Sequence, residues 1–212
     1  MSEQGELRRR AEAEILRACQ QGRHELATTR TLETYGPELM GFLVARLHDH
    51  ELASEAFSEF ALDLWRGIDT FEGRSSVRVW AYALLRHAMG RVLDRQRRHQ
   101  RGNVPLSEVE HISRLVQAIR TETMSFLGTA RRDGVAELRE QLPPDDQNLL
   151  ILRINEGLDW KDVALIMTYD GQVPADDELR REAARLRKRF QLVKDRLRDL
   201  ARDAGLLDDD QA

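Results

Sequence analysis

Residues 77–101, which read VRVWAYALLRHAMGRVLDRQRRHQR, indicate the fold class most directly. Apolar side chains recur there at steps of three and four residues, the spacing of one face of an α-helix. These are Val77, Trp80, Ala81, Leu84, Leu85, Ala88 and Val92. The other side of the same helix carries Arg78, Tyr82, Arg86 and Arg91. The stretch therefore predicts an amphipathic helix whose second half is strongly basic, with six arginines against one acid over residues 86–101.

The residues before this helix show the same helical spacing. A first helix is expected over residues 6–31, which are rich in good helix formers. Tyr35, Gly36 and Pro37 interrupt the pattern, so a second helix is predicted to start at Pro37 and to run to about His48. A third helix should end near residue 66, followed by a loop over residues 67–76. We expect these helices to form one unit over residues 1–101.

The second half of the chain predicts a separate helical unit. Residues 102–141 are polar with weak periodicity, which indicates a partly helical linker. Residues 142–212 then predict a buried helix over residues 149–154, a short helix over 160–167 after a capping Asp159, and a long last helix over 176–204. No segment alternates as a strand would, so the fold class is all-α, with two helical bundles joined by the linker.

Composition restricts the classes of function. The chain has 212 residues, 33 Lys or Arg, 37 Asp or Glu and a formal net charge of −4, so its total charge does not favour binding to a polyanion. Its mean hydropathy of −0.56 and the lack of a long apolar run predict no membrane insertion. The lone Cys19 excludes an intrachain disulfide and a cysteine-based zinc site, which favours a reducing, cytoplasmic location.

Motifs of enzymes and of metal sites are absent from the sequence. It contains no phosphate-binding glycine loop, no nucleophile elbow and no His-Glu-x-x-His pattern. His48, Asp49 and His50 are adjacent, and neighbouring positions on a helix point apart, so they predict no metal site. We therefore expect no enzymatic activity, no catalytic residues, no metal and no cofactor.

The order of helices and basic residues favours contact with DNA. A helix, a short helix and a long basic helix indicate a helix-turn-helix, in which the last helix can enter the major groove. Residues 180–202 hold ten basic residues against three acidic ones. In the first half, Phe71, Trp80 and Tyr82 lie beside arginines, a combination suited to unpaired bases. Spacing places Trp80 on the apolar face, whereas Phe71 and Tyr82 are predicted to be freer to act.

Three motifs in this order resemble the extracytoplasmic-function sigma factors of bacterial RNA polymerase. Residues 53–66, ASEAFSEFALDLWR, resemble the helix with which that family binds core polymerase. Residues 71–82, FEGRSSVRVWAY, resemble the loop and helix that open the −10 promoter element. Residues 142–147, 155–164 and 186–190 resemble the helix-turn-helix that reads the −35 element. The connection over residues 168–177 is longer than that family's usual turn.

The resemblance implies three sets of site residues. The residues for core-polymerase binding are Glu55, Ser58, Glu59, Asp63 and Trp65. Those for recognition and melting of the −10 element are Phe71, Glu72, Gly73, Arg74, Ser75, Ser76, Arg78, Tyr82, Arg86 and Arg91. Those for the −35 element are Arg181, Arg185, Arg187, Lys188, Arg189 and Gln191.

The implied function is a specificity subunit that directs promoter-specific initiation. Its partners would be core polymerase, through the β and β′ subunits, and promoter DNA, and an anti-sigma factor is left open. Because the net charge is −4, the free chain should bind DNA weakly. Two alternatives remain at this point: a free-standing, dimeric helix-turn-helix regulator, and a helical adaptor whose basic faces bind an acidic protein.

Overall fold

The computed structural model describes residues 3–98, 110–128 and 134–206, and every regular element in these ranges is helical. The predicted all-α class is confirmed. The domain boundary at residue 101, the start of the predicted linker and the acidic residues 208–210 lie outside the described ranges. None of the described helices is long and apolar enough to cross a bilayer.

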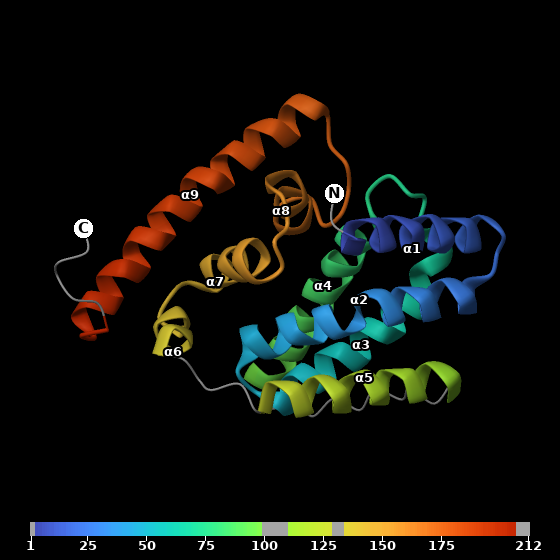
Figure 1. Cartoon of the computed structure of the whole chain (residues 1–212), viewed down its shortest axis with the longest axis horizontal. Coiled ribbons are helices and arrows are strands. Elements are labelled where there is room, and N and C mark those ends of the chain that lie inside the picture. Colours follow the sequence, from blue (N-terminus) through green and yellow to red (C-terminus); the bar gives the residue numbers. More distant parts are fainter. Residues whose placement is uncertain (1–2, 99–109, 129–133, 207–212) are drawn as a thin grey trace.

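The first half is a bundle of helices packed around one core. It comprises α1 (Glu3–Gln20), α2 (His24–Leu47), α3 (His50–Gly67) and α4 (Val77–Arg97), with a single 3-10 turn, η1, over Ile68–Thr70. The core aromatic residues of this bundle include Phe42 and Tyr82, whose rings meet edge to face with centroids 5.5 Å apart. Figure 1 shows α1 and α2 side by side and antiparallel, with α3 and α4 behind them.

Two expectations about the helices of this bundle are wrong. The predicted helix over residues 6–31 is broken after Gln20, where Gly22 adopts a φ of +67° that ends α1. The predicted break at Gly36 and Pro37 does not occur, because α2 continues through both residues. Helix α5 (Glu110–Gly128) packs against α2 at this point, and its Ile119 side chain fills the space that a side chain at Gly36 would need.

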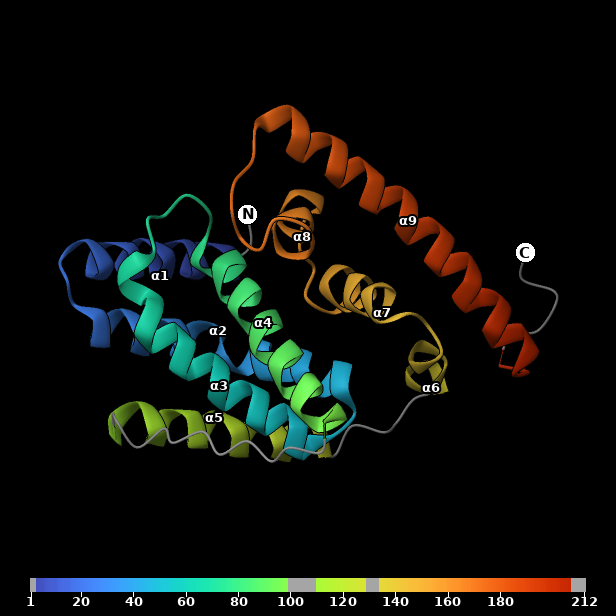
Figure 2. The ribbon, with the colours of Figure 1, turned by 180° about the vertical axis from the view of Figure 1, so that it is seen from behind.

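Helix α5 (Glu110–Gly128) lies within the segment predicted as a partly helical linker. It packs against α2 and α3 through the buried side chains of Ile112, Val116 and Ile119. Figure 2 shows α5 lying along the bundle, on the side away from the long last helix, α9 (Asp176–Asp203). This part of the predicted linker is therefore bound to the first bundle.

The second half packs as a layer on one side of the first. After α6 (Gly134–Glu140), the chain forms α7 (Pro144–Leu150), a wide π-helical turn over Ile151–Asn155 (η3), α8 (Trp160–Met167) and the long α9 (Asp176–Asp203). Asp159 caps α8 as predicted, since its carboxylate accepts hydrogen bonds from the amides of Lys161 and Asp162. Helices α7 and α8 lie between α9 and the first bundle (Figures 1 and 2).

Candidate nucleic-acid interface

The start of α4 is held by one hydroxyl group and one carboxylate. The Ser76 Oγ accepts a hydrogen bond from the Val79 amide at 3.2 Å, as an N-cap does. Glu12 reaches across from α1 and accepts from the amides of Val77 at 2.7 Å and Arg78 at 3.1 Å. The Tyr35 hydroxyl donates to the same Glu12 carboxylate at 2.7 Å. Helix α1 therefore fixes the point at which the loop over residues 71–76 enters α4.

The loop over residues 71–76 is the most exposed part of the predicted −10 site. Glu72, Gly73, Arg74 and Ser76 are exposed and Ser75 is half-buried. Gly73 has a φ of +73°, and an added Cβ would lie 2.7 Å from the Leu16 side chain of α1. Beside the loop is a pocket of about 260 Å³, lined by Thr70, Phe71, Glu72, Arg74, Ser75, Trp80, Gly171 and Gln172.

The aromatic residues of this region differ from the prediction. Phe71 is only 7% exposed and packs on Trp80, with ring centroids 5.3 Å apart, and Tyr82 is fully buried. Trp80 is half-buried and lines the pocket. The prediction that Phe71 and Tyr82 are freer than Trp80 is therefore wrong. The helical spacing places Tyr82 on the same side of α4 as the arginines. Its ring nevertheless faces the bundle, where its hydroxyl donates to Glu38 at 2.9 Å.

The predicted −10 arginines of α4 all have carboxylate or carbonyl partners. Arg78 pairs with Glu38 at 2.7 Å and donates to the backbone oxygen of Glu156 at 2.8 Å. Arg86 donates to the backbone oxygen of Ile166 in α8. Arg91 pairs with two acids of α3, one of them Glu59 at 3.1 Å. In this conformation Arg78 and Arg86 are mostly buried, and Arg91 is the most exposed of the three.

The two glutamates that contact Arg78, Glu38 and Glu156, are half-buried acidic residues where the two halves meet. Burial, and then the nearby Glu38, raise the pKa of Glu156 to about 7, although Arg78 acts in the opposite direction. Burial also raises the pKa of Tyr82 well above its usual value, and Glu38 adds to the effect. Because of its raised pKa, Glu156 is mostly neutral in the packed structure when the pH is below about 7.

The predicted polymerase-binding residues lie on α3, beside α4 and α5. Glu55 and Glu59 both pair with Arg95, and Asp63 pairs with Arg91, so these acids tie α3 to α4. Ser58 is buried and donates to the backbone oxygen of Ser54 at 2.9 Å. The α5 residue Arg120 lies over Ser58, with its guanidinium nitrogen 3.4 Å from the hydroxyl. Trp65 is half-buried.

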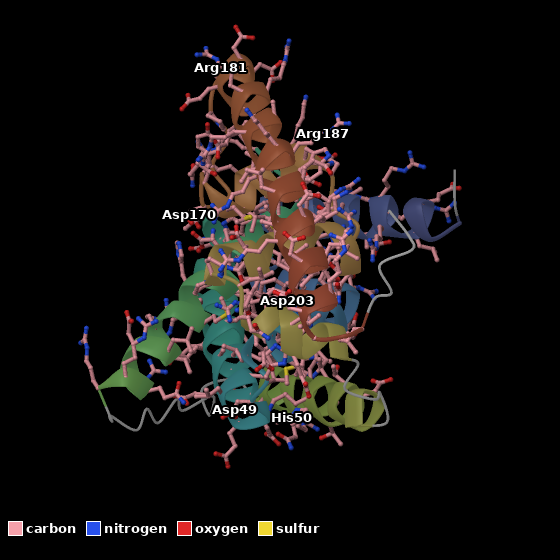
Figure 3. All side chains as sticks on the ribbon, turned by 90° about the vertical axis from the view of Figure 1, so that its left-hand side faces the viewer. Asp49, His50, Asp170, Arg181, Arg187 and Asp203 are labelled. Carbon is pink, nitrogen blue, oxygen red and sulfur yellow. The ribbon has the colours of Figure 1, made fainter. Side chains whose placement is uncertain are left out.

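The predicted −35 residues share one open side of α9. The exposed members are Arg181, Arg185, Arg187, Lys188 and Gln191. Arg189 differs, because it pairs with Asp146 of α7 at 2.6 Å and is half-buried. The opposite side of α9 is apolar and packs on α8, where Phe190 meets Trp160 edge to face at 5.3 Å. Figure 3 labels Arg181 near the start of α9 and Arg187 further along the same helix.

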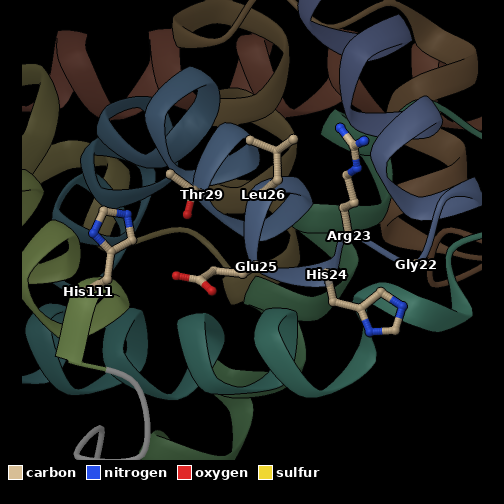
Figure 4. A pocket seen from close by; sticks show the side chains of 7 residues that line it. All are labelled: Gly22, Arg23, His24, Glu25, Leu26, Thr29 and His111. Carbon is tan, nitrogen blue, oxygen red and sulfur yellow. The ribbon is translucent and has the colours of Figure 1, made fainter.

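A larger pocket lies away from these residues, at the corner between α1 and α2. It has a volume of about 560 Å³ and is lined by Gly22, Arg23, His24, Glu25, Leu26, Thr29 and His111. Figure 4 shows that the side chains of Arg23, His24 and Glu25 point in different directions, so the polar groups do not converge on one point. Among the described residues, no group of three or more His, Cys, Asp or Glu could hold a metal ion.

Sequence reasoning missed Glu12 and Glu38, which position the start of α4 and its first arginine. Glu12 adjoins the apolar residues Ala11 and Ile15 of α1, a weak signal that its carboxylate lies near the core. Nothing in the local pattern indicates its partner, since Val77 is 65 residues further along the chain.

Comparison with known proteins supports one family. Residues 31–101 match the family model of sigma-70 region 2, a range that contains α3, the loop over residues 71–76 and α4. The chain is 26% identical over 136 residues to the RNA polymerase sigma-H factor of Pseudomonas aeruginosa, covering 63% of this chain and 70% of that protein. It is 24% identical over 136 residues to the RNA polymerase sigma factor YlaC of Bacillus subtilis, covering 64% and 76%.

No solved structure matches the chain. The family assignment therefore rests on the region 2 match and the two sigma-factor relatives, together with the helical arrangement that carries the matched residues. Residues 31–101 thus resemble sigma-70 region 2, and this match together with the two relatives supports a sigma factor of bacterial RNA polymerase, of the extracytoplasmic-function type.

Proposed function

We propose that this sigma factor initiates transcription with three separate surfaces. The α3 residues from Glu55 to Trp65 bind core polymerase, and the loop over residues 71–76 with α4 recognises and melts the −10 element. The second half of the chain, residues 142–212, binds the −35 element through the exposed basic side of α9. Catalysis belongs to the polymerase, and the chain acts with it in the cytoplasm.

The observation that best supports this proposal is the region 2 match over residues 31–101. The matched range includes both the α3 surface proposed for core polymerase and the loop and α4 proposed for the −10 element. The arrangement of α8 and α9 adds support for DNA contact. The apolar sides of α8 and α9 pack together, which leaves four exposed basic residues along the open side of α9. Arginine suits this position, since its planar guanidinium can bond guanine or phosphate in two places.

The first experiment mixes the purified chain with core bacterial RNA polymerase and separates the mixture by gel filtration. We expect the two to elute together, and the complex to produce discrete transcripts from genomic fragments. Failure to associate with a cognate core enzyme would contradict the proposal. A stable dimer that binds a palindromic duplex without polymerase would instead support the free-standing regulator.

The −35 assignment is tested with the paired substitution Arg187→Ala and Lys188→Ala. Removing side chains that bind phosphates or bases should weaken promoter binding, since each base contact contributes ~1–3 kcal/mol. We therefore expect transcription to fall about tenfold or more when the concentration of the polymerase complex is limiting. The control is Arg198→Ala on the same helix, where the side chain pairs with Asp195 and lies outside the predicted set. Equal effects of the two variants would show that α9 contributes only general charge.

A further inference from the structure

One arginine of the predicted −35 set is held by an acid on its own helix. The Arg185 Nε donates to one carboxylate oxygen of Glu182 at 2.8 Å, and the Arg185 Nη2 donates to the other at 2.6 Å. Among the exposed basic residues of that set, Arg185 is the one that an ion pair holds within the part of the chain that the structure describes. Two of its three guanidinium nitrogens are therefore engaged with a single carboxylate.

The Glu182 carboxylate is held in turn by the end of α8. Thr168, the C-cap residue of α8, donates its hydroxyl hydrogen to the Glu182 Oε1 at 2.8 Å, the same oxygen that accepts from the Arg185 Nη2. The Glu182 side chain keeps 12% of its surface exposed, whereas Arg185 keeps 64%. The carboxylate thus lies low between α8 and α9, which pack together in Figure 1, and the guanidinium extends into solvent. We call these three residues the Arg185 triad.

The hydrogen bonds of the triad keep both of its ionisable members charged. The bond from Arg185 lowers the pKa of Glu182, burial raises it, and the bond from Thr168 lowers it again, so that the net shift is downward. The bond to Glu182 also raises the pKa of Arg185. An exposed ion pair adds little to folding stability, so the main effect of this pair is on the direction of the guanidinium.

The pair leaves one edge of the guanidinium free. An arginine side chain has five N–H donors, and Glu182 accepts from the Nε and from one side of Nη2. The remaining donors, on Nη1 and on the other side of Nη2, form the outer edge of the group. Two parallel N–H bonds on this edge match the O6 and N7 acceptors that guanine presents in the major groove.

A held arginine suits a base better than a phosphate. The negative charge of Glu182 offsets that of Arg185, so the pair adds no net charge to the counterion-dependent attraction to DNA. Fixing a long side chain before binding reduces the conformational entropy that binding would otherwise cost. Fixing its direction also penalises any base whose acceptors do not match. The geometry of the triad therefore favours selectivity over general affinity.

We propose that Arg185 reads a guanine of the −35 element, and that Glu182 and Thr168 are positioning residues for its guanidinium. This inference rests on the proposed function, because it needs the exposed side of α9 to face the −35 element. Loss of Glu182 should then change which promoter sequences are used, and this change should exceed its effect on the total amount of transcript.

The test uses the complex of the chain with core polymerase. The template is a promoter library in which every position of the −35 element carries all four bases. Sequencing of the transcripts gives the preference for each base at each position. This readout separates loss of selectivity at one position from a general loss of binding, which lowers transcription from all templates alike.

The variants should act at one shared position. Arg185→Ala removes the bidentate contact, so the preference for guanine there should fall about tenfold. Glu182→Gln and Thr168→Val retain Arg185 but loosen it, so the same preference should fall about threefold and about twofold. The matched control is Asp195→Asn, which breaks a pair of the same spacing with Arg198 on the same helix, outside the predicted set. It should change no preference.

Three results would overturn the inference. A uniform loss over all −35 sequences in Arg185→Ala would show that this side chain binds a phosphate. A preference changed at a different position in Glu182→Gln would show that the carboxylate reads a base itself. Unchanged preferences in Glu182→Gln and Thr168→Val, with a changed one in Arg185→Ala, would show that the arginine reads DNA without support.

Nuclear magnetic resonance tests the triad in the free chain. An Nε–H group that donates to a carboxylate exchanges its proton with water more slowly than a solvated one, so a slowly exchanging signal is expected that is absent in Arg185→Ala. It should exchange faster in Glu182→Gln and remain slow in Asp195→Asn. Fast exchange in the unchanged chain would contradict a held guanidinium. Circular dichroism checks that each variant is folded, and Thr168→Val decides the question if Glu182→Gln is not.

The same variants separate this inference from the proposed function. If Arg187→Ala with Lys188→Ala weakens transcription while Arg185→Ala alters no base preference, the −35 surface stands and only the guanine reading is overturned. If the slowly exchanging Nε–H is present but no α9 variant alters transcription, the −35 assignment is itself wrong, and the guanine reading is overturned with it.

Discussion

Glu12 links the N-terminal helix to the start of α4, part of the predicted −10 surface, through a single carboxylate. It accepts hydrogen bonds from two amides at the start of α4 and from the Tyr35 hydroxyl, all within 3.1 Å. Backbone amides in the first turn of a helix have no partner within the helix, so a buried helix start needs acceptors from elsewhere. Together with the contact between Leu16 and Gly73, this makes α1 a support for the predicted −10 loop.

Replacement of Glu12 tests this support. Glu12→Ala leaves two amides and one hydroxyl without their acceptor, so we expect it to lower the free energy of unfolding by about 1–3 kcal/mol. Urea denaturation followed by circular dichroism measures the change. Glu14→Ala is the control, because Glu14 lies on the same helix with an exposed side chain. Equal losses of stability for the two variants would contradict a capping role for Glu12.

At the same scale, the sequence predicted exposure well on α9 and poorly on α4. On α9 the apolar spacing left five of the six predicted −35 residues exposed, and Arg189 is the exception because α7 supplies Asp146. On α4 the same reasoning placed Tyr82 among the free side chains, although it is buried against Phe42 and Glu38. Helix α4 packs on α3, α2 and α8, so no single apolar stripe describes its buried surface.

Individual elements were predicted best where caps and spacing agree. Helix α8 begins after its predicted cap Asp159, and α9 begins at Asp176 as expected. Helix α2 was predicted wrongly because Gly36 and Pro37 are local signals for a break, whereas packing against α5 decides the outcome. The contact that decides it joins residues 36 and 119, which no local pattern connects.

Substitutions at two glycines of α2 distinguish the effect of helix propensity from the effect of packing against α5. Gly41→Ala adds a Cβ with nothing within 4 Å, so it should stabilise the chain by about 0.5–1 kcal/mol through helix propensity. Gly36→Ala places its Cβ 2.6 Å from the tip of the Ile119 side chain, so that gain should be cancelled or reversed. Thermal unfolding of both variants measures the difference. Ile119→Val, which removes the clashing methyl, should restore the gain in the Gly36→Ala background, and no restoration would contradict close packing of α5.

At the scale of the whole molecule, pH should act on the contact between the two halves. Glu156 lies in the second half and faces Glu38, Arg78, Tyr82 and Arg8 of the first, and its pKa is raised to about 7. The packed structure therefore holds the proton more tightly than the unfolded chain does. The stability from this difference is present below the ordinary pKa of 4.5 and is lost as the pH rises through about 7. Asp162, whose pKa is raised to about 6 by burial and by Asp159, adds a loss in the same direction.

The substitution Glu156→Gln imitates the protonated side chain and tests this pH dependence. We expect its melting temperature to match that of the unchanged chain at pH 4, below the ordinary pKa of a glutamate, and to exceed it at pH 8. Calorimetry at the two pH values measures the effect, with Glu110→Gln as the control because that carboxylate is largely exposed. A stabilisation of equal size at both pH values would show that the charge of Glu156 is not involved.

The hydrogen bond between Glu12 and α4 also limits when the first bundle can fold during synthesis. Ribosomes add about 5–20 residues per second, so the carboxylate waits roughly 3–13 s for Val77, which follows 65 residues later. The α1 to α4 bundle has all of its own residues once α4 has emerged. Gly171, whose backbone lies against Ala83 of α4, is synthesised some 70 residues after the end of the matched region 2. In the nascent chain, this side of α4 therefore stays uncovered for several seconds before the second half can pack on it.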